Sequence, residues 1–273
     1  MTELIPLGIN GFFPYNGRQT ACYMVIKNDT AIILDAGTGI SGLLSEEIKG
    51  KLKGKHIHII LSHYHLDHTC GLSYLTGVTH NAEITLFCPL YPLVKAKNIN
   101  GLKKLLSPPL FSLKLENLNI MVKEIDKENF KIGKINIKLL KQYHPGGSVG
   151  IRIDNDITYI TDTVVSDKTA RFANNVKLLL HELWLTDKEL KSAPLEVDGK
   201  RPEEKHSYEG GVIKIATDSK CENVMPIHMT PWRTEKDIKA LVNRINQKGV
   251  NALLPEEFKS IYIGKSIGSK IEQ

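Results

Sequence analysis

The stretch HIHIILSHYHLDHTCG, residues 56–71, crowds three histidines and an aspartate into six positions directly after a mostly apolar run. These residues are His63, His65, Asp67 and His68. The run before them has the pattern of a β-strand that ends at Leu61, so Ser62 begins the loop that carries the four side chains. Imidazole and carboxylate groups are ligands of divalent zinc, and a tight loop lets them converge on one point. The stretch therefore predicts a metal site rather than a polar surface loop.

Three more side chains of metal-binding type follow other apolar runs. His144 follows INIKLLKQY, Asp162 follows ITYIT, and His228 follows NVMPI. A single histidine at the end of a strand is more often structural than functional. Together with the first four residues, however, these three make seven potential donors, which is enough for two metal ions.

Composition places the chain among globular proteins. It has 273 residues, of which 41% are hydrophobic and 24% charged, so it has enough apolar material for a core. No apolar run approaches the roughly 20 residues of a membrane-spanning helix, and the N-terminus MTELIPLGIN lacks the order of a signal peptide. We therefore expect a single domain over residues 1–273, with no membrane span and a cytoplasmic location.

Cysteine usage and charge add little to this picture. The four cysteines include no CxxC pair, so we expect reduced thiols rather than a disulfide framework. The net charge of +6 comes from scattered lysines, nine of them between Lys103 and Lys141. Such a distribution is typical of a solvated face, which can also attract an anionic substrate.

Short strand-like runs recur along the chain, with a few helical patterns between them. Helical spacing of apolar residues predicts helices over 40–52, over 207–219 with Ser207 at its start, and over 238–245 with Thr234 as N-cap. The stretch IRIDNDITYI, residues 151–160, predicts a β-hairpin, and segments 98–112 and 186–205 are expected to be irregular. This set of elements indicates an α+β fold in which helices cover sheets.

Five motifs resemble those of the metallo-β-lactamase superfamily. They are LDAGTG (34–39), HYHLDH (63–68), HPGGS (144–148), TDT (161–163) and IHM (227–229). The resemblance runs through most of the chain and implies a four-layer αββα sandwich with a dinuclear metal site at one edge. It implies that one ion is bound by His63, His65 and His144, the other by Asp67, His68 and His228, with Asp162 bridging them. Asp35 would orient the metal-binding loop, or would simply end a strand.

The implied site is that of a hydrolase. Two cations about 3.5 to 4 Å apart would share a bridging hydroxide, which attacks the substrate. Asp67 would accept a hydrogen bond from that hydroxide in addition to binding a metal. Two divalent ions are thus the expected cofactors. Zinc is favoured by imidazole and carboxylate ligands without a thiolate, although Mn²⁺ and iron accept the same set.

Two further motifs resemble the ribonuclease Z and phosphodiesterase branch of the superfamily. They are HEL at residues 181–183 and KHSYEGG at residues 205–211. The resemblance makes His206 the residue that protonates the leaving oxygen or stabilises the phosphorane, with Glu182 supporting its protonated form. The other interpretation is a histidine that caps a helix and a glutamate on the surface.

The expected substrate is a small phosphodiester, such as a cyclic nucleotide or a short nucleic-acid end. Ribonuclease Z carries its tRNA-gripping arm between the positions that match His144 and Asp162, and here a tight hairpin fills that interval. Segments 98–112 and 186–205 are candidates for the walls that select the substrate. We further expect a homodimer, because dimers are the commonest assembly of soluble proteins.

Three alternatives stay open. A thioesterase similar to glyoxalase II would use the same seven ligands, but such enzymes end in a longer helical extension and lack a counterpart of His206. A ribonuclease Z-like RNA endonuclease would have to hold its substrate without the arm. A relative without enzymatic activity would be expected to lack ligands, and all seven are present.

Overall fold

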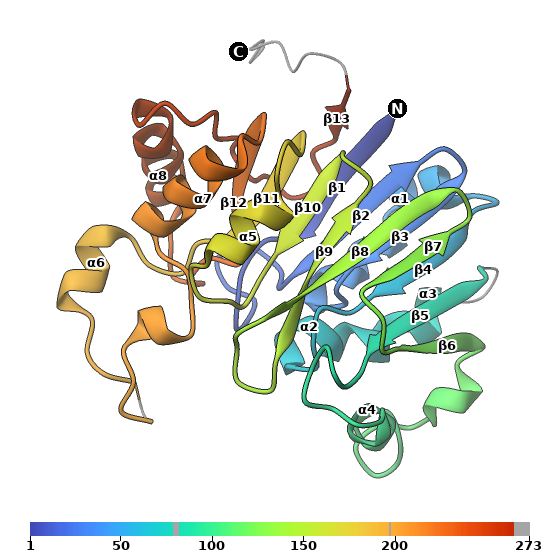
Figure 1. The fold of residues 1–273 in the computed structure, drawn as a ribbon. Coiled ribbons are helices and arrows are strands. Elements are labelled where there is room, and N and C mark those ends of the chain that lie inside the picture. The colour runs from blue at the N-terminus through green and yellow to red at the C-terminus, as the bar shows by residue number, and fades with distance from the viewer. Residues whose placement is uncertain (79–81, 197, 265–273) are drawn as a thin grey trace.

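The computed structural model describes residues 1–78, 82–196 and 198–264, which form two β-sheets packed face to face (Figure 1). Among these residues the first sheet has the strand order β13-β1-β2-β3-β4-β5-β6, and the second has the order β12-β11-β10-β9-β8-β7. The strands of the first sheet are β1 (Thr2–Gly8), β2 (Cys22–Lys27), β3 (Thr30–Leu34), β4 (His56–Ile60), β5 (Ile84–Pro89), β6 (Ile120–Ile125) and β13 (Ile261–Ile263). Those of the second are β7 (Asn129–Ile132), β8 (Ile135–Gln142), β9 (Ser148–Ile153), β10 (Ile157–Ile160), β11 (Leu178–Glu182) and β12 (Asn223–Ile227).

Both sheets mix parallel and antiparallel pairs. In the first sheet β3 to β6 run parallel, while β1 pairs antiparallel with β2 and β13, and β2 with β3. In the second sheet β10, β11 and β12 run parallel, and the strands from β7 to β10 pair antiparallel. Parallel neighbours end at the same edge of a sheet, so the loops that follow them gather there.

Helices cover the outer faces of both sheets (Figure 1). On the first sheet lie α1 (Glu46–Leu52), α2 (Leu66–Thr69), α3 (Leu75–Val78) and α4 (Asn100–Leu105), with 3₁₀ turns at Thr38–Leu44, Cys70–Tyr74 and Leu115–Asn117. On the second lie α5 (Asp167–Phe172), α7 (Glu209–Ser219) and α8 (Glu235–Gln247), while α6 (Asp187–Ser192) and the 3₁₀ turn Pro202–Glu204 lie to one side. The predicted α+β class and αββα sandwich are confirmed.

Side chains alternate between two apolar layers along the inner strands of the first sheet. In β3, Ile32 and Leu34 belong to the core between the sheets, whereas Ile33 packs under the helices. This alternation follows from the two-residue period of a strand. Each sheet is therefore buried on its inner face and partly covered on its outer face.

Two of the helix predictions need correction. The helix predicted over 40–52 is wrong as a single element, because Ser45 is extended (φ −66°, ψ 144°) and its side chain accepts a hydrogen bond from the Ile48 N–H as the cap of α1. The helix predicted over 207–219 begins later, at Glu209, because Ser207 bonds elsewhere. The helix after Thr234 is confirmed, and Thr234 forms a capping box with Asp237.

The remaining sequence predictions fare unevenly. The hairpin over 151–160 is confirmed as β9 and β10. Segments 98–112 and 186–205 are less irregular than expected, since each contains a short helix. Strands β1, β6 and β7 were not anticipated. Strands β6 and β7 lie at sheet edges, where charged residues are tolerated in place of apolar ones.

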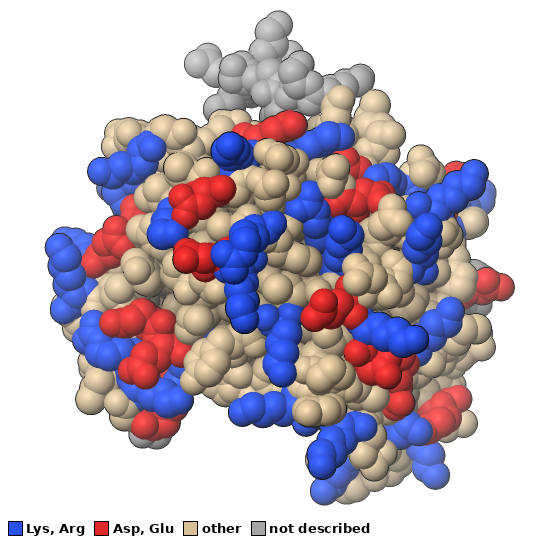
Figure 2. Space-filling model, viewed as in Figure 1, with Lys and Arg blue, Asp and Glu red and all other residues tan. Residues whose placement is uncertain are grey.

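The distribution of surface charge and the state of the cysteines agree with what the sequence predicts. Basic and acidic side chains are interspersed over the face shown in Figure 2, and Lys131 and Lys138 are exposed. All four cysteines are free thiols. Within the described ranges, none of the helices has the length and apolar sequence that crossing a membrane requires.

Candidate metal centre

The seven predicted metal ligands meet at one edge of the sandwich, although they come from distant parts of the chain. His63 and His65 lie on the loop after β4, and Asp67 and His68 lie in the short helix α2. The other three follow strands of the second sheet: His144 after β8, Asp162 after β10 and His228 after β12. The centre therefore spans the seam between the two sheets.

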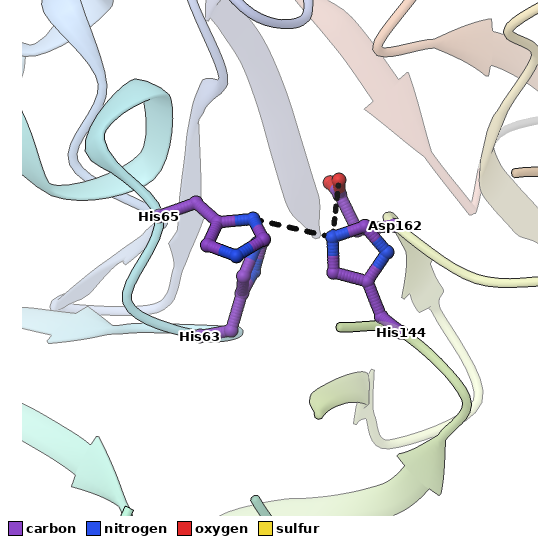
Figure 3. A group of neighbouring side chains, drawn as sticks. All are labelled: His63, His65, His144 and Asp162. Atoms are coloured by element: carbon purple, nitrogen blue, oxygen red, sulfur yellow. Dashed lines mark hydrogen bonds and ion pairs between the residues drawn. The ribbon is translucent and has the colours of Figure 1, made fainter. Parts of the chain in front are cut away.

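The first group of donors is His63, His65, His144 and Asp162 (Figure 3). One potential ligand atom from each of these residues lies within 4.8 Å of the others. His144 Nε2 is 3.2 Å from His65 Nδ1 and 3.3 Å from Asp162 Oδ1. Three imidazoles and a carboxylate thus face a common point.

The second group is Asp67, His68 and His228. His228 Nε2 lies 3.1 Å from both Asp67 Oδ2 and His68 Nε2. Asp162 reaches this group as well, because its Oδ2 is 3.0 Å from His68 Nε2 and 3.1 Å from His228 Nε2. The two oxygens of Asp162 therefore face one group each.

Three residues at the centre have an unusual backbone. Asp35 and His228 follow a strand directly, Asp162 follows one after Thr161, and the three have positive φ angles of 61°, 46° and 46°. Residues with side chains rarely adopt this left-handed region, which costs of the order of 1–3 kcal/mol each unless the surroundings impose it. The fold accepts this cost at three strand ends that deliver polar side chains to the same place.

The carboxylate of Asp35 organises the first-sheet side of the centre. It is fully buried and accepts hydrogen bonds from Ser62 N (2.6 Å), Ser62 Oγ (2.7 Å) and Tyr159 OH (2.6 Å), and His68 Nδ1 lies 2.7 Å away. Since a carboxylate only accepts, His68 Nδ1 carries the proton and Nε2 faces the centre. Ser62 Oγ gives its proton to Asp35, so it accepts from His63 Nδ1 at 2.9 Å. The Nε2 lone pairs of both histidines are thereby directed inward.

The carboxylate of Glu182 organises the second-sheet side. It is fully buried at the end of β11, and its Oε1 accepts from the backbone N–H groups of Thr163 (2.8 Å) and Ser207 (2.9 Å). Its Oε2 lies 3.1 Å from His206 Nδ1 and 3.6 Å from His228 Nδ1. Glu182 is thus not a surface residue, and His206 does not cap a helix.

A family model described as the beta-lactamase superfamily domain matches residues 30–229, which include all seven candidate ligands. The chain belongs to this superfamily. Its members are metal-dependent hydrolases, and the predicted superfamily is confirmed. A search of curated proteins gave no match.

Solved structures share the fold over nearly the whole chain. The metallo-β-lactamase fold protein YhfI from Bacillus subtilis has a TM-score of 0.72 and 18% identity, over 96% of this chain and 99% of that one. A diphosphatase of the PhnP family has a TM-score of 0.67 and 15% identity, over 96% and 98%. The short form of human tRNase Z has a TM-score of 0.66 and 17% identity, over 96% and 99%.

The donor set fits the divalent cations of this superfamily. Nε2 of His63 is buried and finds no hydrogen-bond partner among the described residues. Burial alone would lower the pKa of His228, but Asp162, Asp67 and Glu182 outweigh it and raise this pKa to about 10. Without a cation, protons would therefore supply the positive charge that the carboxylates require. Binding of a cation would displace them, as is usual for sites built from histidines.

His206 and Glu182 hold each other in their charged forms. Burial would lower the pKa of His206, but the charge and hydrogen bond of Glu182 outweigh it and raise this pKa. Burial would likewise raise the pKa of Glu182, but His206 and His228 lower it to about 2. The pair therefore favours an imidazolium supported by a carboxylate.

Several residues around the centre were missed by sequence reasoning. Tyr159 lies in an apolar strand, and nothing in its neighbourhood indicates its bond to Asp35. Gly11 packs so closely on His228 that an added Cβ would lie 2.6 Å from the ring, and Phe12 N donates to Asp67 Oδ2 at 2.9 Å. Trp184, whose ring stacks on His206, was also missed, although its position directly after the HEL motif could have drawn attention to it.

Proposed function

We propose that this superfamily member is a dinuclear metal-dependent phosphodiesterase that acts on a small phosphodiester, such as a cyclic nucleotide or a short nucleic-acid end. The observation that carries the proposal is the pair of His206 and Glu182, whose Nδ1 and Oε2 atoms are 3.1 Å apart. Glu182 favours the protonated form of His206, which lies beside the centre and is not one of the seven candidate ligands. Cleavage of a phosphodiester needs such a proton donor for the leaving oxygen.

The seven donors would hold the two cations in the two groups described above. His63, His65 and His144 would bind one ion, Asp67, His68 and His228 the other, and Asp162 both. When bound, the ions would activate water and offset the negative charge that develops on the phosphoryl group. We propose zinc as the metal, with Mn²⁺ and iron compatible with the same ligands.

His206 is proposed as the general acid. Because Nδ1 is turned towards Glu182, Nε2 is the nitrogen available to the substrate, and the side chain retains 15% exposure. Its ring centroid lies 5.4 Å from that of His144, so the proton is held close to the donors. Glu182 is a positioning residue, since two backbone N–H groups fix its other oxygen and prevent it from turning away.

Asp67 is proposed to orient the attacking water. Its Oδ2 accepts from Phe12 N and approaches His228, and these contacts fix the plane of the carboxylate. Within the part of the chain that the structure describes, Oδ1 takes no part in them. That oxygen is therefore free to accept a hydrogen bond from water.

Neither alternative uses all of these features. A thioesterase of the glyoxalase II kind would have no use for the His206 and Glu182 pair. A ribonuclease Z-like endonuclease would use the pair but would lack the arm, because β9 and β10 form a tight hairpin between His144 and Asp162. The small phosphodiester is therefore the better-supported substrate.

The proposal is tested with the metal-reconstituted protein, bis(p-nitrophenyl) phosphate and a glutathione thioester. For a diester with an alcohol leaving group, such as a dinucleotide, we expect hydrolysis to fall by about 10² to 10⁴ in His206→Ala, because general acids contribute about this much. Release of p-nitrophenolate, which leaves without a proton, should depend less on His206. Metal content, measured by mass spectrometry, should not change. His56, a half-buried histidine at the start of β4, supplies the control variant His56→Ala. Thioester cleavage that is indifferent to His206 would overturn the proposal in favour of the thioesterase.

The assembly and extent of the protein are further proposals. We propose that residues 1–273 act as a single domain, since β13 from the end of the described chain pairs with β1 from its start. A homodimer and a cytoplasmic location stay predictions from the sequence. Sedimentation of the purified protein tests the first of these.

A further inference from the structure

Five aromatic rings, four of them exposed and that of Trp184 half-buried, gather beside the candidate metal centre. They belong to two loops and to the residue after the HEL motif, and we call them the aromatic rim: Phe12, Phe13, Tyr15, Trp184 and Trp232. Phe12 is 66% exposed and Trp232 is 57% exposed. The rim contains both tryptophans of the chain. Large rings that stay in water beside a reaction centre indicate a binding surface.

The rim is in direct contact with residues of the candidate metal centre, through the backbone of Phe12 and the ring of Trp184. Phe12 N donates a hydrogen bond to Oδ2 of Asp67, a candidate metal ligand, at 2.9 Å. This bond fixes the backbone that carries the Phe12 ring. The Trp184 ring stacks on His206 with centroids 4.9 Å apart and planes 22° apart. It also lies 5.8 Å from the ring of His228. A substrate whose scissile phosphate reached His206 would bring its next group against these rings.

Hydrogen bonds to backbone carbonyl groups hold the rim in place. Gly11 N donates to Met229 O at 2.9 Å, and Arg18 Nη2 donates to Pro231 O at 3.1 Å, which ties the two loops together. Arg233 Nη2 donates to Trp184 O at 3.0 Å. Phe12 itself has a φ of 67°, a conformation that a bulky residue adopts only when its surroundings impose it. The exposed rings are thus presented on a fixed frame.

The two tryptophans form a corner. Their ring centroids are 6.3 Å apart and their planes meet at 69°. A flat ring can stack on one indole of such a corner while its edge meets the other, which is a favourable arrangement for aromatic groups. The corner therefore selects a planar ring over a bulky aliphatic group.

We propose that the aromatic rim binds a nucleobase next to the scissile phosphate and so makes nucleotide-bearing diesters the preferred substrates. This inference rests on the proposed phosphodiesterase function and adds the residues that recognise the substrate. Phe12 and Trp232 are its specificity-determining residues. Stacking of a base on aromatic side chains is tolerant of base identity, so the rim distinguishes a base from no base rather than one base from another.

Binding is tested first, because both tryptophans report on it. We titrate the metal-loaded protein with adenosine 5′-monophosphate and with ribose 5-phosphate, which differ only in the base. We expect saturable quenching of tryptophan fluorescence by the nucleotide alone. Phe12→Ala, which keeps both fluorophores, should weaken nucleotide binding about tenfold. Tyr262→Ala supplies the control, since Tyr262 is 48% exposed and pairs with Glu3 near the start of β1, whereas Phe12 follows the end of that strand.

Hydrolysis then separates the rim from the proposed function. The substrates are the p-nitrophenyl ester of thymidine 5′-monophosphate and methyl p-nitrophenyl phosphate, which share a leaving group. We expect kcat/KM to favour the thymidine ester, and this preference to fall about tenfold in Phe12→Ala and in Trp232→Ala.

Each contrary result has a different meaning. Equal kcat/KM for the two esters in the unmodified protein would contradict the proposal that the rim binds a nucleobase, but would leave the proposed phosphodiesterase activity supported. Nucleotide binding without hydrolysis of either ester would contradict the proposed phosphodiesterase activity but would still support nucleobase binding by the rim. Tryptophan fluorescence that changes with protein concentration but not with nucleotide would contradict nucleobase binding. It would indicate that these rings form a contact between two copies of the protein.

Discussion

Strand β10 begins after one buried aspartate and ends before another, and the two have opposite surroundings. Asp156, before the strand, accepts from Thr2 Oγ1 (2.7 Å), Lys27 Nζ (2.6 Å) and Lys177 Nζ (2.8 Å). Asp162, after the strand, faces imidazoles that approach within 3.0 to 3.3 Å and has a left-handed backbone. The first carboxylate is paired with cationic partners in the chain, whereas the second lies among side chains that could hold a metal ion.

The difference shows how one short strand can serve stability at one end and chemistry at the other. At Asp156, burial would raise the pKa, but the hydrogen bonds and charges of Lys177 and Lys27 lower it to about 2. At Asp162 the pKa is also lowered, by His228, His68 and His63 against the effect of burial, yet these partners are themselves candidate ligands. Changes at the two ends should therefore affect different measurements.

The largest effect is expected for Asp162→Ala. Loss of the carboxylate that faces both donor groups should reduce metal content and lower hydrolysis by an amount on the order of 10³-fold, since metal ions supply several kcal/mol of charge stabilisation. Metal analysis of the purified variant, together with hydrolysis of the model diester, provides the measurement. Full metal content in this variant would show that Asp162 is not shared between the ions.

Asp35→Asn should have the next largest effect. The amide would present a donor to groups that now donate to Asp35, so the orientation of His68 would be lost. Changes of this kind typically cost 10- to 100-fold in metal affinity. Competition with a chromophoric chelator measures that affinity, and an unchanged value would mean that the Asp35 network serves folding alone.

Asp156→Asn should instead lower the free energy of unfolding by about 1–2 kcal/mol, because charge-assisted bonds to two lysines weaken. Urea denaturation measures this, and hydrolysis should be unaffected. The effect depends on pH with a definite sign. A depressed carboxyl pKa stabilises the fold above the unfolded value near 3.8, and the benefit disappears as the pH falls through about 2. The variant should lack this part of the acid dependence, and an equal slope in both proteins would contradict the assignment.

Lys177→Ala should have the smallest effect, below about 1 kcal/mol. The Lys177 side chain is 37% exposed and makes one ion pair, whereas Lys27 is 19% exposed and contacts both Asp154 and Asp156. Exposed pairs contribute little because water screens them. Lys27→Ala is the matched comparison, and a larger loss for Lys177 than for Lys27 would reverse the ranking of the partners.

The residues of the candidate metal centre were easier to predict from the sequence than the residues that support them. Few residue types bind metals, so His63, His65, Asp67 and His68 are informative even without a structure. The partners of these residues use common side chains brought together by the fold. Tyr159 lies 124 positions from Asp35, and only the docking of the two sheets makes them neighbours.

The fold was predicted best where local signals agree with tertiary packing. The helix after Thr234 has both a capping box and an apolar face, and it forms as expected. The helix predicted over 40–52 has the apolar face, but Ser45 starts a new helix within it. The aromatic rim shows the opposite limit. Exposed rings carry no periodic signal, and their meaning comes only from their distance to the metal centre.

The position of the donors across the seam between the sheets has a consequence for the stability of the whole molecule. His63 and His65 belong to the first sheet, whereas His144 and Asp162 belong to the second. A cation bound by all four side chains would link the two sheets, and it would bind the unfolded chain poorly. By mass action, each tenfold increase of free metal above the dissociation constant would then add about 1.4 kcal/mol to the free energy of unfolding. The supply of metal would thus set the thermal tolerance of the protein as well as its activity.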